Sequence, residues 1–318
     1  MNGTYGNRQS TGLSPDWPWV VSRGPRIMTD VVALPIASWD HPCSAAEQEE
    51  AIRALERGSV LLFPQLSFYL PEDERRLLSP AIAGAGKNVS LDLSRGRLRG
   101  SRADEAGSGL LQDMMKRFAT SSRTLLGSLL PRYTVGLQQA RTSFRPVEIA
   151  GRATSWRKDD TRLHVDSFPS SPTKGTRILR VFTNINPHGQ SRAWRLGESF
   201  EGAATHHLRS VSGPIWGTSH VLNMLGITKG RRSAYDHFML RLHDRMKSDM
   251  EYQSAVAQSV HEFHPGSTWI VFTDQVSHAA TGGQYALEQT YHLPVDCMLD
   301  QSQAPLRILE RLLDRKLV

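Results

Sequence analysis

The stretch 160-DTRLHVDSFPSSP-172 places His164 and Asp166 one residue apart, inside a run with the alternation of a β-strand. Because side chains alternate between the two faces of a strand, Arg162, His164 and Asp166 are predicted on one face, with apolar side chains on the other. Two ligands at positions i and i+2 can converge on one metal ion. A chain with 12 histidines contains such a pair by chance often enough that the pair alone does not indicate a metal site. The surrounding sequence must show whether these residues bind a metal.

The surroundings are rich in short β-strand patterns. From about residue 133, apolar and β-branched runs alternate with Gly, Pro and Asn: YTVGLQQ, RLHVD, TRILRVFTNIN, STWIVFTD, SHAATGG and ALEQTYHLPV. Short strands at close spacing favour a sandwich or barrel over a parallel sheet with crossover helices. We expect a mainly β protein with flanking helices (α+β) and a double-stranded β-helix core, the jelly roll of cupin-like proteins, over about 133–300.

The segments before this core are predicted to be partly disordered and partly helical. Residues 1–35 are rich in Gly, Ser, Asn and Pro and are expected to be disordered. Residues 36–318 are expected to form a single domain. Within it, 45–58 has the composition of a helix, 59–64 that of a short apolar strand, and 73–125 is predicted to be mainly helical.

Two further helices are predicted around the core. Residues from about 232 to 253 carry apolar side chains four positions apart and read as an amphipathic insert covering one flank. Residues from about 305 to 317 place leucine and isoleucine on one stripe, with Arg and Lys opposite. A helix docked on the domain is the favoured interpretation of this last segment, and a membrane-surface helix is the alternative.

A third metal ligand is expected from a strand near the other end of the core. His278 is the preferred candidate because it follows the apolar strand TWIVF and the loop TDQVS and precedes the turn at Gly282 and Gly283. His292 is the alternative. Two histidines and one carboxylate leave open positions on Fe(II), where a chelating keto-acid and dioxygen can bind together.

A keto-acid needs a cation for its distal carboxylate. In many such barrels this cation lies ten to fourteen residues after the distal histidine, but Glu288 and His292 stand there instead. The strand 176-TRILRVFTNIN-186 offers a substitute, since Arg180 and Asn184 share one face. Arg162 is the rival cation, and a salt bridge to an internal carboxylate is the structural alternative for Arg180.

The charge and composition of the chain favour some classes of binding partner and exclude others. The net charge of +7 and pI near 9.6 favour an acidic partner such as phosphate, carboxylate or an anionic membrane face. No nucleic acid is expected, because nucleic-acid-binding motifs are missing. Two cysteines, no apolar run long enough to span a bilayer and no secretory signal predict a cytoplasmic protein, with peripheral contact at the inner face of the inner membrane as an option.

Longer motifs give a more specific signal. The runs 156-WRKDDTRLHVDSFPSSPTKGTRILRVFTNINPHGQSRAWRLGESF-200 and 272-FTDQVSHAATGGQYALEQTYHLP-294 resemble the Kdo hydroxylase family of Fe(II)/2-oxoglutarate-dependent dioxygenases. The pieces HVDSFPS, NINP and WRLGESF are much more specific than the HxD tripeptide. That family hydroxylates C3 of the sugar acid Kdo in the lipopolysaccharide inner core of Gram-negative bacteria, giving the 3-hydroxy acid Ko.

The resemblance implies roles for particular residues. His164, Asp166 and His278 are implied as the ligands of Fe(II), with 2-oxoglutarate and O2 as cosubstrates. A Kdo-containing glycolipid of the Kdo-lipid A type is the implied acceptor. In the polar segment SRAWRLGESF, read as a loop, Trp194, Arg195 and Glu198 are candidates for holding the sugar acid.

Two other functions remain compatible with the pattern. One is a cupin-like metal enzyme that isomerises or hydrolyses an anionic sugar without an oxidant. The other is a non-enzymatic basic module that binds an anionic glycolipid. A dioxygenase takes up oxygen when the keto-acid is present, whereas the isomerase or hydrolase does not. A binding module gains no activity when it is loaded with iron.

Overall fold

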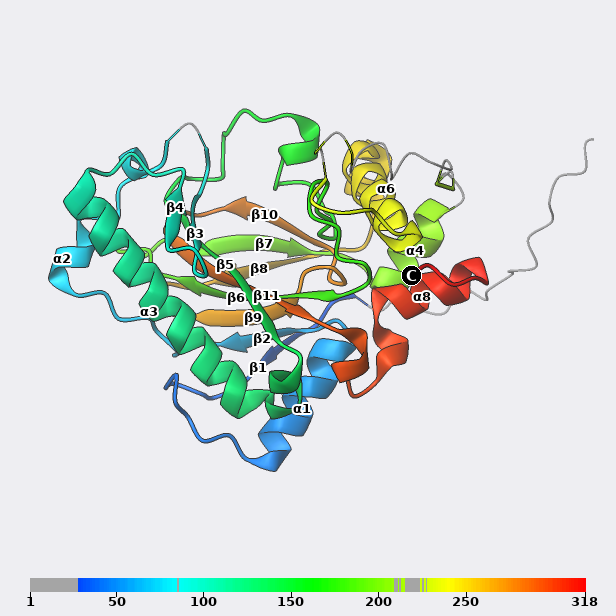
Figure 1. Cartoon of the computed structure of the whole chain (residues 1–318), viewed down its shortest axis with the longest axis horizontal. Helices are drawn as coiled ribbons and strands as arrows, with labels where there is room; N and C mark the ends of the chain where they lie inside the picture. The colour runs from blue at the N-terminus through cyan, green and yellow to red at the C-terminus, as the bar shows by residue number, and fades with distance from the viewer. Residues whose placement is uncertain are drawn as a thin grey trace, which may run out of the picture.

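The computed structural model describes residues 28–84, 86–208, 211, 213–214, 224, 226 and 228–318, and it contains two β-sheets flanked by helices (Figure 1). The larger sheet has the order β1-β2-β9-β6-β11-β5-β3-β4. Its strands are β1 (Val31–Ala33), β2 (Val60–Phe63), β3 (Val89–Asp92), β4 (Arg97–Arg99), β5 (Gln138–Arg145), β6 (Arg177–Asn184), β9 (Thr268–Phe272) and β11 (Ala286–Leu293). The smaller sheet has the order β10-β7-β8, with strands β7 (Arg192–Leu196), β8 (Ser259–Phe263) and β10 (His278–Gly282).

The two sheets pack against each other through an aromatic core. Phe182 and Trp269 of the larger sheet stack with their ring centroids 5.2 Å apart. From the smaller sheet, the Phe263 ring stacks on Trp269 at 4.1 Å, and Trp194 meets Phe182 edge-on at 5.2 Å. Burying such rings supplies much of the driving force for sheet packing. The expected jelly-roll core with flanking helices is confirmed.

The outer face of the larger sheet is covered by helices α1 (Ala45–Glu56) and α3 (Glu105–Leu129) (Figure 1). Helix α1 begins with a capping box in which Ser44 and Glu47 bond each other's backbone N–H groups. It ends before Gly58, whose φ of 90° favours glycine. The predicted helix over 45–58 and the strand after it are therefore confirmed.

Other helices close the end of the molecule near the C-terminus (Figure 1). The predicted insert at 232–253 consists of two helices, α6 (Ala234–Ser248) and α7 (Met250–Ala255). The C-terminal helix α8 (Pro305–Leu313) packs on α4 (Phe200–Leu208) and buries Leu306, Ile308 and Leu309. This burial favours the docked helix, because its apolar stripe is already covered. The remaining short helices are α2 (Glu72–Arg75) and 3-10 turns at Pro80–Ile82, Pro131–Val135, Trp156–Lys158, Val295–Cys297 and Gln301–Gln303.

Several sequence predictions were wrong in detail. The segment 73–125 is not helical throughout, since β3 and β4 pair antiparallel at the edge of the larger sheet. The predicted disorder over residues 1–35 was wrong at its C-terminal end, because β1 (Val31–Ala33) pairs in parallel with β2. Such edge strands are held by backbone hydrogen bonds, which composition does not reveal. Residues 1–27 lie outside the described residues. No helix in the described part of the chain is long and apolar enough to cross a bilayer.

Candidate metal centre

A single β-bridge brings the HxD segment to β10. His164 N–H donates to His278 O at 3.0 Å, and His278 N–H donates to His164 O at 2.9 Å. Asp166 N–H donates to Thr273 O at 2.8 Å, just beyond the end of β9. The strand predicted at 162–166 was therefore wrong, because only this isolated bridge forms. The alternation of side chains nevertheless places both candidate ligands on the side of His278.

The three candidate ligands lie together. One donor atom from each of His164, Asp166 and His278 falls within 4.8 Å of the others. Each histidine uses Nδ1 for a backbone carbonyl two residues earlier: His164 Nδ1 lies 2.8 Å from Arg162 O, and His278 Nδ1 lies 2.8 Å from Val276 O. An Nδ1–H donated to a carbonyl leaves the lone pair on Nε2, so both rings are held in the tautomer that binds a metal through Nε2.

The electrostatics of the site also suit a metal. Burial lowers the pKa of the His164 imidazole well below its usual value, and the neighbouring His278 adds to the effect. Burial also lowers the pKa of His278. For Asp166 burial opposes ionisation, but the Arg180 guanidinium and the two imidazoles hold its pKa below the usual range. Neutral imidazoles and an ionised carboxylate are the forms that coordinate metals. The buried Asp166 Oδ2 lies 2.9 Å from Arg180 Nη2, and two nitrogens with one carboxylate suit Fe(II).

Aromatic rings fix the orientation of the histidines. The Trp194 ring stacks on His278 at 5.1 Å between ring centroids and an interplanar angle of 24°. On the other side, His243 of α6 meets His164 edge-on at 5.4 Å. Trp194 is 2% exposed, and it contacts the candidate metal centre through the His278 ring.

A row of charged side chains leads away from the centre along β6, β11 and β5. Arg180 Nη2 lies 2.9 Å from Asp166 Oδ2, and its Nη1 lies 3.1 Å from Glu288 Oε1. Arg145 Nε donates to Glu288 Oε2 at 2.7 Å. Glu288 thus occupies the place where the commoner pattern has a cation, and two arginines from neighbouring strands surround it. Arg180 forms the internal salt bridges that were the structural alternative to a keto-acid.

Comparisons with known proteins agree with this geometry. The sequence profile of the 3-deoxy-D-manno-oct-2-ulosonic acid (Kdo) hydroxylase family matches residues 38–316. The chain belongs to the Kdo hydroxylase family.

Solved structures of one Kdo hydroxylase, described as a non-haem Fe(II) alpha-ketoglutarate-dependent dioxygenase, are similar over most of the chain. The form with alpha-ketoglutarate and Fe(III) is 49% identical, with a TM-score of 0.89, covering 91% of this chain and 98% of that one. The form with succinate and Fe(III) is 48% identical, with a TM-score of 0.88 and the same coverage. A comparison with curated proteins finds no match.

Within this family member, the other predicted site residues are used differently. Asn184 donates to the backbone carbonyls of Gln190 and Phe263, and its Oδ1 accepts from Asn186 N–H, so all of its polar atoms bond the protein. Arg162 Nε donates to Asp159 at 3.1 Å, and its Nη1 donates to Lys247 O at 2.9 Å. These contacts give no support for a cosubstrate role of either side chain.

The segment predicted as a polar loop at 191–200 is mostly a strand, so that prediction was wrong. Arg192, Trp194 and Leu196 alternate inward along β7 and are buried. Arg195 on the other face donates to Gln258 Oε1 at 3.0 Å and also to a backbone carbonyl, while Glu198 is 3% exposed. None of Trp194, Arg195 and Glu198 lies on an exposed loop. The polar composition of this segment favoured a loop, although the alternation of Arg192, Trp194 and Leu196 is typical of a strand.

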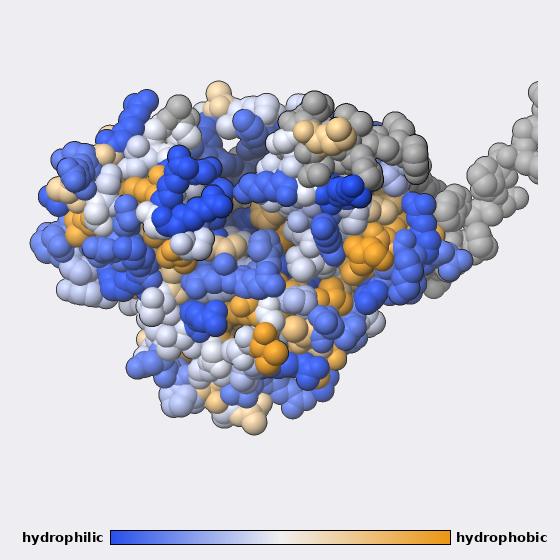
Figure 2. Space-filling view, viewed as in Figure 1, coloured by the Kyte–Doolittle hydropathy of each residue, from blue (hydrophilic) through white to orange (hydrophobic). Residues whose placement is uncertain are grey.

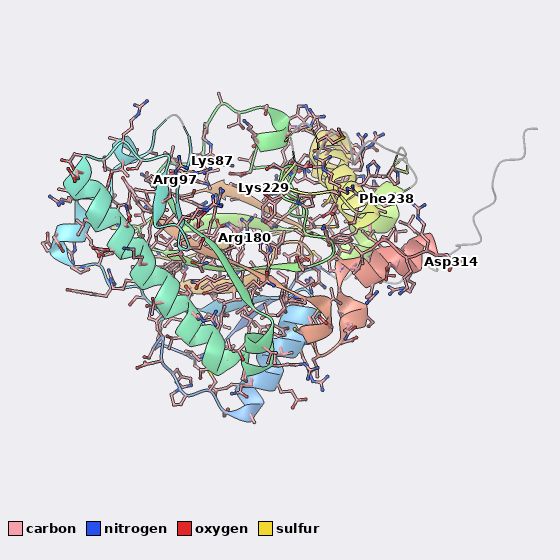
Figure 3. All side chains as sticks on the ribbon, in the orientation of Figure 1. Lys87, Arg97, Arg180, Lys229, Phe238 and Asp314 are labelled. Atoms are coloured by element: carbon pink, nitrogen blue, oxygen red, sulfur yellow. The ribbon has the colours of Figure 1, made fainter. Side chains whose placement is uncertain are left out.

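Sequence reasoning missed most of the basic residues near the centre. Lys87 and Arg152 both pair with Asp160, and Lys247 is a buried lysine on α6. Figure 3 labels Lys87 and Arg180 on the same central region of the molecule, and Figure 2 shows this face hollowed there, with hydrophilic residues at the border. These residues come from separate segments, so no local motif joins them.

Proposed function

We propose that His164, Asp166 and His278 hold the Fe(II) of a Kdo hydroxylase, and that the chain hydroxylates C3 of Kdo to give Ko. The family and its dioxygenase class rest on the comparisons. The observation that carries the site is the reciprocal His164–His278 backbone bridge, with both Nδ1 atoms bound to carbonyls and both Nε2 atoms left for a metal.

Fe(II), 2-oxoglutarate and O2 together supply the oxidant that converts a C–H bond of the sugar into C–OH. The protein's residues contribute geometry. Trp194 and His243 restrict the two histidine rings, and the carbonyls of Arg162 and Val276 set their tautomer. No side chain is needed as a general acid or base, so the precision of the ligand positions is the main contribution of the fold.

Arg180 is the proposed anchor of 2-oxoglutarate, with Arg145 beside it. Arg180 reaches both the ligand Asp166 and Glu288, so it lies within a few ångströms of the metal centre on the inner side of the larger sheet. Glu288 competes for this guanidinium, and a bound dicarboxylate replaces one of its ion pairs. Placing the anchor on β6 explains why the usual position on β11 carries a glutamate.

The proposed acceptor is a Kdo-containing glycolipid, reached at an anionic membrane surface by peripheral contact. The net charge of +7 supports this, because a basic protein gains encounter rate with anionic surfaces at low salt. No role in nucleic-acid binding is proposed.

The test is mass spectrometry of a Kdo-containing lipid after incubation with the iron-loaded protein, 2-oxoglutarate and O2. The expected result is a gain of one oxygen on Kdo, with oxygen uptake that requires the keto-acid and is absent in His278→Ala. A changed sugar without oxygen uptake would indicate the isomerase or hydrolase alternative. Lipid binding without any iron-dependent turnover would indicate a binding module.

A further inference from the structure

We propose that Lys247 binds the C1 carboxylate of the Kdo residue and so places C3 at the metal centre. This inference rests on the proposed function and adds a substrate-positioning residue to it. It concerns helix α6, which the sequence suggested only as a cover over one flank of the core.

Helix α6 presents one face directly to the HxD segment. His243 on this face contacts the ring of the ligand His164 at 5.4 Å. Lys247 follows four residues later, one turn along the same face. Its backbone carbonyl accepts a hydrogen bond of 2.9 Å from Arg162 Nη1, two residues before His164. The turn of helix that carries Lys247 is therefore fixed against the segment that carries two metal ligands.

The ammonium group of Lys247 has no carboxylate in direct contact among the described residues. Asp160, Asp166 and Asp159 act on it from further away, and each of them is paired with another cation. The residue is 2% exposed, and its Nζ donates to the backbone carbonyl of Arg157 at 3.1 Å. Lys247 forms no ion pair with a carboxylate in the described part of the chain. By contrast, the buried guanidinium of Arg177 pairs with Asp274 at 2.7 Å. A buried cation without a counter-ion costs free energy, which a bound carboxylate would recover.

Arg192 is the other buried cation without an ion pair among the described residues, but it faces a different region. It stands at the opposite end of β7 from Leu196, the residue that pairs with His278, and its Nη1 donates to Gly283 O at 3.0 Å. Lys247 instead lies one helical turn from His243, which contacts the His164 ring, and its backbone carbonyl is bound by Arg162 of the HxD segment. Of the two, Lys247 is the cation on the side of the metal ligands.

The chemistry of the sugar requires a cation close to the metal. In a 3-deoxy-2-ulosonic acid the carboxyl carbon C1 and the methylene carbon C3 are both bonded to C2. With carbon–carbon bonds of about 1.5 Å, C1 and C3 are only about 2.5 Å apart. When C3 faces the iron, the carboxylate lies beside it, so a lysine at the outer rim could not reach it. A buried ammonium one helical turn from a residue that touches His164 meets this requirement.

The experiment compares the sugar acid with its C1 amide in the wild type, Lys247→Met and Lys158→Met. Methionine replaces the apolar stem of lysine and removes the ammonium group, and Lys158 is an exposed lysine in the neighbouring turn that serves as the matched control. The wild type and Lys158→Met are expected to prefer the acid to the amide by about 30-fold or more in kcat/KM, the usual loss for an unpaired buried charge partner. Lys247→Met should discriminate by less than about 3-fold, with the Kd for Fe(II) and for 2-oxoglutarate unchanged.

Other outcomes separate the inference from the function on which it rests. If Lys247→Met still prefers the acid as strongly as the wild type, Lys247 does not bind the carboxylate, although the hydroxylase function stands. If the wild type turns over neither the acid nor the amide while it binds iron and 2-oxoglutarate, the proposed substrate is wrong. If Lys247→Met folds poorly, the ratio of kcat/KM for the acid to that for the amide is measured in the wild type and in Lys247→Arg instead. A wild type that does not discriminate between acid and amide overturns the inference.

Discussion

Replacing Arg180 by alanine should weaken 2-oxoglutarate binding much more than sugar binding. The guanidinium is about nine-tenths buried and reaches Asp166 and Glu288 at 2.9 and 3.1 Å, so it can offer a forked contact to a carboxylate near the metal. Loss of such a partner for a buried carboxylate typically costs about 2 to 5 kcal/mol, or roughly 30-fold to several-thousand-fold in affinity. Arg145 remains next to Glu288 and can recover part of this loss, which favours the lower half of the range.

The assay is titration of the iron-loaded protein with 2-oxoglutarate, together with KM values for the cosubstrate and the sugar. Arg162→Ala is the control, because its side chain is bound to Asp159 and to a backbone carbonyl. Glu288→Gln should move the Kd for 2-oxoglutarate in the opposite direction, toward tighter binding, since it removes the competing carboxylate. If Arg162→Ala raises the KM for 2-oxoglutarate while Arg180→Ala leaves it unchanged, the assignment to Arg180 is refuted.

Three further predictions follow from particular contacts. Single alanine variants of His164, Asp166 and His278 should each lose stoichiometric Fe(II) and all turnover while keeping the fold, as measured by metal content and circular dichroism, whereas metal retention lost only in His292→Ala would show that the wrong distal histidine was chosen. Burial lowers the pKa of His207 to about 4, so only the unfolded state binds its proton between pH 6.5 and 4, and His207 should contribute about 1 to 2 kcal/mol to the fall in stability from pH 6.5 to 5. Urea unfolding of His207→Gln should show a fall smaller by about this amount, and an unchanged fall would contradict this cause. Arg177→Met should lower the free energy of unfolding by about 3 to 5 kcal/mol because it leaves Asp274 buried and unpaired. Adding Asp274→Leu should restore much of this loss, and denaturation midpoints that do not recover in the double variant would argue against the unpaired charge as the reason.

The sequence alone determined the elements with strong local periodicity. Helix α1 and strands β6, β9 and β11 lie within a few residues of their predicted positions, because capping residues, a terminal glycine and apolar runs act over short distances. The three candidate iron ligands were also chosen from sequence, since the HxD pair and the order of turn, strand and loop before His278 are local patterns. The motifs HVDSFPS and WRLGESF indicate the family without any information on geometry.

Only the tertiary structure decided which charges meet. Arg180, Glu288 and Arg145 come from three neighbouring strands, and their pairing depends on strand order, which a single sequence does not specify. The same holds for Lys247, whose contact with Arg162 depends on how α6 packs on the HxD segment. The contacts of Arg162 with Lys247 and of Arg145 with Glu288 join residues 85 and 143 positions apart and are set by the global packing of the sheets. The candidate ligands could therefore be proposed from local pattern, while the residues around them could not.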